Sequence, residues 1–191
     1  MLIALMLPSV VAGQQEEKKQ KPARIKPALL VIDIQNAYLP MMAERDRERG
    51  MMFINYAIQM FRLYGHPVIR VYNTDPSYGP PRDSREFEFP DSVLIKPDDP
   101  KIVKNYPSAF KKTDLEKVLR EKGCNTVFLC GLSAVGCVLA TYYGAQDLDF
   151  NTFMVKDALM SQNPAYTDMV EDITNAVGYQ ALEVMLANAE K

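Results

Sequence analysis

The chain has 191 residues, of which 48% are hydrophobic and 24% are charged, and its formal net charge is -2. The length suits one domain, and the composition excludes a disordered or collagen-like chain. The one basic cluster, "KKQKPARIK" (18–26), contains no aromatic residue, which argues against a nucleic-acid-binding surface.

The N-terminal sequence differs from the rest of the chain. "MLIALMLPSVVAG" is apolar and ends in small residues, which predicts a signal peptide over 1–13 and a polar linker over 14–26. The apolar stretch is too short to span a bilayer, and no later segment approaches that length. We therefore expect export to the periplasm or the medium, without a membrane span in the mature chain. The alternative is a buried N-terminal helix in a cytoplasmic protein, because no Lys or Arg precedes Lys18.

Residues 27–191 form the predicted domain. "PALLVIDIQ" (27–35) is a short apolar, β-branched run, which is typical of a strand buried on both faces, here ending at Asp33. A partly amphipathic stretch over 43–64 predicts a helix, and "GHPVIRVYN" (65–73) predicts a turn and a second buried strand.

The middle of the chain begins with a long segment rich in proline and charge. Residues 74–100 predict an irregular loop, and a loop of this length in a compact domain is usually functional. A short third strand then ends near Lys104. Over 113–123, Thr113 and Glu116 suggest a capping box at the start of a helix, whose end is marked by Gly123.

The remaining elements also alternate. We expect a strand over 125–131, a helix over 135–148, a strand over 151–158, a helix over 164–177 and a weak final strand over 181–185. Alternating buried strands and helices imply a parallel sheet with helices on both faces. The predicted architecture is an α/β fold, a three-layer α/β/α sandwich with a doubly wound, mainly parallel six-stranded sheet in the order 3-2-1-4-5-6.

Three reactive side chains follow predicted strands. Asp33, Lys104 and Cys137 lie at or just beyond carboxyl ends, where doubly wound sheets bind ligands. A thiol is activated by a base, a cation or a helix N-terminus, and Asp33, Lys104 and the helix beginning near Val135 would supply these. The alternative is structural: a packed cysteine, a solvated lysine and a paired buried aspartate.

Longer motifs resemble a known family. "KNYPSAFKKTDLEKVLREKGCNTVFLCGLSAVGCV" (104–138) is similar to the signature of the isochorismatase-like cysteine hydrolases. "VIDIQNAYL" (31–39), "GHPVIRVYNTD" (65–75) and "VKDA" (155–158) extend the resemblance over about residues 27–160 in the correct order.

The resemblance implies specific roles. Asp33, Lys104 and Cys137 would form a catalytic triad, and the Leu132–Ser133 peptide would be cis. The backbone N–H groups of Ser133 and Cys137 would form an oxyanion hole. Homo-oligomers are also expected from the resemblance.

The departures from the family concern the loop before the cysteine and the metal site. Ala134 and Val135 replace a common threonine and acidic residue. Metal-binding relatives carry histidines after the second strand, whereas the single histidine here, His66, precedes it. Mainly oxygen ligands such as Asp75 and Asp83 remain, so we expect neither a metal nor another cofactor.

The sequence therefore predicts a metal-independent hydrolase that cleaves a C–N bond of a small amide or carbamoyl-type substrate through a thioester. One alternative is an isochorismatase-type vinyl-ether hydrolase, which would not need Cys137. Another is a non-catalytic binding module or a redox-sensing thiol. The candidate substrate contacts are Asn36, Tyr38, Tyr72, Tyr106 and Phe110, and core packing is the alternative for the aromatic ones.

Overall fold

The computed structural model describes residues 24–77 and 79–190. The predicted signal peptide (1–13) and most of the predicted linker lie outside these ranges. Within them, no helix combines the length and the apolar character needed to cross a membrane.

The order of the elements alternates as the sequence predicts. The strands are β1 (Pro27–Ile32), β2 (Val68–Asn73), β3 (Lys101–Lys104), β4 (Thr126–Leu132), β5 (Asn151–Met160) and β6 (Ala176–Val177). The helices are α1 (Glu44–Leu63), α2 (Leu115–Glu121), α3 (Leu139–Gln146), α4 (Pro164–Ile173) and α5 (Tyr179–Ala187). The described residues also form a 3-10 turn at Leu39–Met41 and a π-helical turn at Ala134–Val138.

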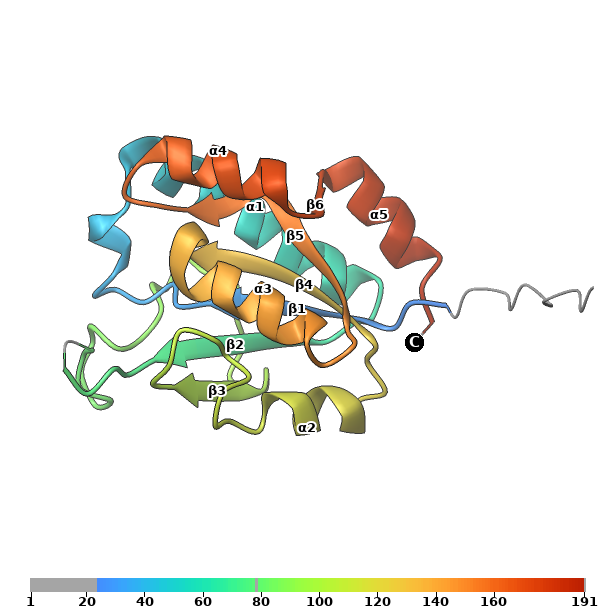
Figure 1. The fold of residues 1–191 in the computed structure, drawn as a ribbon, viewed down its shortest axis with the longest axis horizontal. Coiled ribbons are helices and arrows are strands. Elements are labelled where there is room, and N and C mark those ends of the chain that lie inside the picture. Colours follow the sequence, from blue (N-terminus) through green and yellow to red (C-terminus); the bar gives the residue numbers. More distant parts are fainter. Residues whose placement is uncertain (1–23, 78, 191) are drawn as a thin grey trace, which may run out of the picture.

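The six strands form one sheet in the order β3-β2-β1-β4-β5-β6, and every neighbouring pair is parallel. This confirms the predicted doubly wound order. Helices lie on both faces, with α3 in front of the sheet and α1 behind it in Figure 1. Strand order reverses between β1 and β4, so the ends of these two strands define the switch point where ligands bind in such sheets.

The core consists of two apolar layers, one on each face of the sheet. Along β1, Leu29 and Val31 face the layer that contains α1 and α5, whereas Leu30 and Ile32 face the layer that contains α2 and α3. Because both faces are covered, β1 is buried along its whole length. This burial explains why its sequence is continuously apolar instead of alternating.

The C-terminal region differs from the prediction. The expected strand over 181–185 is wrong, because these residues belong to α5. Leu182 and Leu186 are its buried side chains, and their spacing of four residues matches the period of a helix. The sixth strand is the two-residue β6, inside the predicted helix over 164–177, which ends earlier as α4.

The predicted capping box is also absent. The Thr113 hydroxyl accepts a hydrogen bond from Leu115 N at 3.2 Å and donates to the carbonyl of Ala109, while Glu116 pairs with Arg120 one turn further on. The helix therefore begins after Thr113. Gly123 has a φ of 70°, as expected at the end of a helix.

Candidate active site

The carboxyl edge of the sheet brings Asp33, Lys104 and Cys137 into contact. Lys104 Nζ lies 2.7 Å from Asp33 Oδ2 and 3.1 Å from Cys137 Sγ. Lys104 ends β3, two strands from β1, and neighbouring strands lie about 4.8 Å apart. Only a long side chain can reach across β2 to Asp33, which gives a physical reason for lysine at this position. Asp33 and Lys104 are each only 1% exposed, and Cys137 is half-buried.

Close approach of β1 and β4 places the aspartate. Asp33 has a φ of 56°, in the left-handed region that aspartate tolerates better than most residues. Beside it, Gly131 has a φ of 124°, and a Cβ there would lie 2.1 Å from the carbonyl oxygen of Ile32. Glycine at 131 therefore lets the two strand ends come together at the site.

A π-helical turn places the cysteine. The predicted helix over 135–148 divides into this turn and α3. Val138 N donates to the carbonyl of Ser133, and Gly136 adopts a non-helical φ of -112° and ψ of -108° inside the turn. π-helical turns are frequent at functional sites. The Leu132–Ser133 peptide that leads into the turn is cis, as the family resemblance implied.

Burial and the neighbouring charges together shift the pKa values of the three groups. It raises the pKa of the Asp33 carboxyl, against the opposing effect of the Lys104 ammonium group. Burial and the Asp33 charge raise the pKa of Cys137 to about 12, and Lys104 opposes them. Burial alone would lower the pKa of Lys104, but the neighbouring Asp33 and Cys137 shift it upward. At neutral pH the sulfur is therefore a thiol beside a cation.

One of the two oxygens of the Asp33 carboxyl group is available to accept a proton. Lys104 donates to Oδ2, whereas the buried Oδ1 accepts no hydrogen bond from the described residues. An unpaired buried acceptor is costly unless it has a functional partner. The arrangement can therefore take up a proton at Oδ1 while Lys104 holds the other oxygen.

The candidate contacts after β1 and in β2 differ in exposure. Asn36 is partly exposed, and its Nδ2 donates to the carbonyl of Arg85 at 2.8 Å, which fastens the 74–100 loop. Tyr38 is partly buried and packs against the layer of α1. Tyr72 is fully buried, with its ring 5.1 Å from that of Phe87 and 4.4 Å from that of Phe89. For Tyr72 this favours the alternative of core packing.

The other two candidates lie in the loop after β3. Tyr106 is partly exposed, with Lys111 Nζ and Lys112 Nζ 4.5 Å and 5.3 Å from its ring centre. A hydrogen bond with Lys112 and the charges of both lysines lower the pKa of Tyr106. Phe110 packs with its ring 5.8 Å from that of Phe150.

Two buried polar residues that are not among the predicted site residues support the site. Gln35 donates to the carbonyl of Asn73 at 3.0 Å and accepts from Asn73 N at 2.7 Å, which joins the ends of β1 and β2. Thr141 donates to the carbonyl of Cys137 at 2.7 Å and accepts from Ala109 N at 3.0 Å. The sequence signals for Gln35 are its position directly after an apolar strand and its place two residues after Asp33 in the "VIDIQNAYL" motif that resembles the family.

Metal ligands are not gathered in the described part of the chain. No group of three or more His, Cys, Asp or Glu side chains there is arranged to hold a metal ion. His66 is buried at the start of β2, at the opposite edge of the sheet from Cys137, and its Nε2 lies 3.2 Å from the carbonyl oxygen of Leu186.

Comparison with known proteins identifies the family. A model of the isochorismatase domain matches residues 27–182. The uncharacterized isochorismatase family protein YddQ of Bacillus subtilis is 33% identical over 138 residues, covering 69% of this chain and 76% of that protein. Maleamate amidohydrolase of Pseudomonas putida is 27% identical over 153 residues, covering 70% and 72% of the two chains. The crystal structure of N-carbamoylsarcosine amidase from Thermoplasma acidophilum has a TM-score of 0.69 and 26% identity, covering 81% of this chain and 95% of that one. The chain described here therefore belongs to the isochorismatase family of hydrolases.

Proposed function

We propose that the protein is a metal-independent cysteine hydrolase that cleaves a C–N bond of a small amide or carbamoyl-type substrate. The observation that carries the proposal is the position of Lys104 Nζ, 2.7 Å from Asp33 and 3.1 Å from Cys137. Two relatives support it, because their names, maleamate amidohydrolase and N-carbamoylsarcosine amidase, describe cleavage of this kind of bond.

The first step is attack by Cys137 on the substrate carbonyl. Since its pKa is raised to about 12, the thiol loses its proton only as the S–C bond forms. Asp33 Oδ1 accepts that proton, and burial favours this because it raises the pKa of the carboxyl. The buried Lys104 ammonium group stabilises the negative charge that develops on the sulfur.

The tetrahedral intermediate then loses the amine. The backbone N–H groups of Ser133 and Cys137 donate to its oxyanion, as the family resemblance implies. The C–N bond breaks while Asp33 transfers the proton to the leaving nitrogen, which leaves a thioester on Cys137. A water molecule attacks the thioester with Asp33 as base, the C–S bond breaks, and the proton returns to the sulfur as the acid is released.

A panel of small amides, ureas and isochorismate, incubated with EDTA-treated protein, tests the proposal through the products formed. We expect amine or ammonia release from at least one C–N substrate. Cys137→Ala and Asp33→Asn should each lower kcat by about 10³-fold or more, because the nucleophile or its base is lost. Cys124→Ser is the matched control, since Cys124 precedes β4 at the other edge of the sheet.

Three results would contradict parts of the proposal. Near-normal turnover by Cys137→Ala would rule out the thioester, and cleavage of isochorismate alone would favour the vinyl-ether hydrolase. Loss of activity with EDTA that zinc restores would show that the reaction needs a metal.

Self-association of the chain remains an expectation from the family resemblance.

A further inference from the structure

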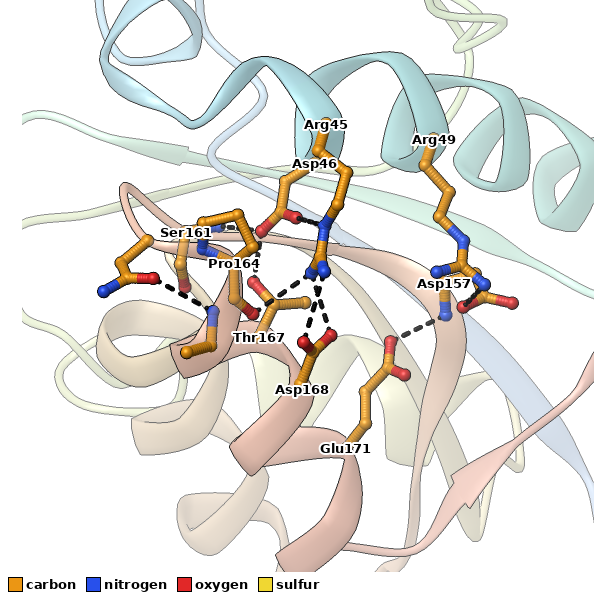
Figure 2. Close-up of polar contacts among 11 residues, drawn as sticks. Arg45, Asp46, Arg49, Asp157, Ser161, Pro164, Thr167, Asp168 and Glu171 are labelled. Atoms are coloured by element: carbon orange, nitrogen blue, oxygen red, sulfur yellow. Dashed lines mark hydrogen bonds and ion pairs between the residues drawn. The ribbon is translucent and has the colours of Figure 1, made fainter.

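A cluster of charged and polar side chains joins α1, the end of β5 and α4, outside the triad. Figure 2 shows its arginines and Asp46 on α1 facing acidic and hydroxyl side chains of β5 and α4. Asp46 is only 3% exposed, and its carboxylate accepts hydrogen bonds from the Thr167 hydroxyl, from Ser161 N at 3.1 Å and from Arg45 Nε at 3.0 Å. A buried carboxylate with three donors is held in one orientation.

This carboxylate fixes the residue that follows β5. Ser161 is fully buried, its N–H donates to Asp46, and its carbonyl accepts from Ala43 N at 2.9 Å. Both backbone polar groups of Ser161 are thus held by the beginning of α1. Thr167, itself only 4% exposed, holds Asp46 from the side of α4.

The fixed segment adjoins the proposed oxyanion hole. Met160 pairs with Leu132 at the end of the β4–β5 ladder, and Leu132 precedes Ser133. One turn after Asp46, a Cβ on Gly50 would lie 2.8 Å from the side chain of Met160. Helix α1 therefore packs directly on this end of β5, and a continuous chain of contacts leads from Asp46 through Ser161 and Met160 to Leu132.

A second contact shows why β5 needs such support. The register between β4 and β5 shifts between Leu129 and Gly131, and Asp157 lies in the irregular stretch with a φ of 67°. Arg49 of α1 lies 2.6 Å from the Asp157 carboxylate, and Glu171 of α4 accepts from Asp157 N at 2.7 Å. The hydrogen bonds between β4 and β5 are interrupted at this bulge. Contacts from helices α1 and α4 therefore help to hold β5 in place beyond it.

We propose that Asp46 and Thr167 are positioning residues, which hold the end of β5 so that the N–H of Ser133 stays in place to bind the oxyanion. This inference rests on the proposed function. Neither residue forms a hydrogen bond with Asp33, Lys104 or Cys137. They act through Ser161, Met160 and Leu132.

Two reagents that modify Cys137 differently test the proposal. p-Nitrophenyl acetate acylates the thiol through a tetrahedral oxyanion, forming an S–acetyl bond and releasing p-nitrophenolate. Iodoacetamide alkylates it by direct displacement of iodide, without an oxyanion. The rate of each reaction is measured for every variant, and the rate of Cys137→Ala is subtracted. The ratio of the acylation rate to the alkylation rate then measures how much the oxyanion hole accelerates acylation, separately from the reactivity of the sulfur.

The variants are chosen as a matched set. Thr167→Val keeps the shape of the side chain but removes the hydroxyl, and Asp46→Asn weakens the same contacts. Each should lower the acylation rate about tenfold, a part of the loss seen when an oxyanion donor is removed outright, while alkylation is unchanged. Thr167→Ser should restore the ratio. Asp168→Asn is the control, because it weakens the exposed pair with Arg45 in the same helix turn and leaves the hydrogen bonds from Thr167 and Ser161 to Asp46 in place.

The outcomes separate this inference from the proposed function. A wild-type ratio in both Thr167→Val and Asp46→Asn would overturn the positioning role and leave the proposed function standing. A parallel fall in acylation and alkylation, or no rescue by Thr167→Ser, would also overturn it, because it would indicate a general loosening of the fold. A wild-type ratio no higher than that of the urea-unfolded protein would refute the oxyanion hole itself, and both proposals with it.

Discussion

At the scale of single residues, the charges around Cys137 predict its reactivity. Its pKa of about 12 means that alkylation by iodoacetamide should accelerate steadily from about pH 7 to about pH 10 without a plateau. Asp33→Asn removes a negative charge, so the thiol pKa should fall and the rise of the alkylation rate with pH should shift to lower pH. Lys104→Ala removes the cation in contact with the sulfur, so the pKa should rise and alkylation should slow.

Mass spectrometry of quenched samples locates the label on Cys137 and separates it from Cys124 and Cys130, which are buried. Cys137→Ala supplies the background. If both variants keep the wild-type pH profile, Asp33 and Lys104 do not act on the sulfur, and the triad would have to be abandoned.

At the scale of elements, the close approach of β1 and β4 predicts that position 131 accepts only glycine. Gly131→Ala combines a φ of 124° with a clash at 2.1 Å, whereas Gly123→Ala, with a φ of 70°, meets nothing closer than 3.9 Å. We expect Gly123→Ala to lower the free energy of unfolding by about 1 kcal/mol and Gly131→Ala by about 3 kcal/mol or more. Urea denaturation measures both, and equal losses would contradict the steric argument.

At the scale of the whole molecule, buried thiols make the free energy of unfolding depend on pH in the alkaline range. Cys130 is fully buried, and burial raises its pKa. Above about pH 8.5 the unfolded chain loses a proton that the folded chain keeps, so the free energy of unfolding is unaffected below this pH and falls above it. One such thiol contributes a slope of up to about 1.4 kcal/mol per pH unit.

Comparison of the wild type with Cys130→Ala isolates this contribution, because the other titrating groups are shared. Urea unfolding at several pH values between about 9 and 11 should give a steeper decline for the wild type. The substitution also leaves a small cavity, which lowers stability at every pH and does not change the slope. Parallel declines would show that Cys130 ionises equally in both states.

The sequence by itself determined the sheet order and the three residues at its carboxyl edge. Local signals gave the strands and the polar residues at their ends, namely continuous apolar runs for strands buried on both faces and polar residues where the runs stop. The family resemblance then supported the strand order and the roles of the three residues. The doubly wound order places the end of the first strand, with Asp33, next to Cys137. The resemblance to the isochorismatase-like cysteine hydrolases, rather than the strand order alone, implied that Lys104 joins them as a triad.

Only the tertiary structure decided the remaining features, because they depend on partners far apart in the chain. Gln35 bonds a residue 38 positions away, and Asp46 bonds Thr167 across 121 positions, so neither pairing leaves a local pattern. The two-residue β6 is too short to show a period, and Tyr72 stacks on rings supplied by an irregular loop. The local sequence indicates which residues will be buried. Which residues they contact depends on how distant segments of the chain pack together.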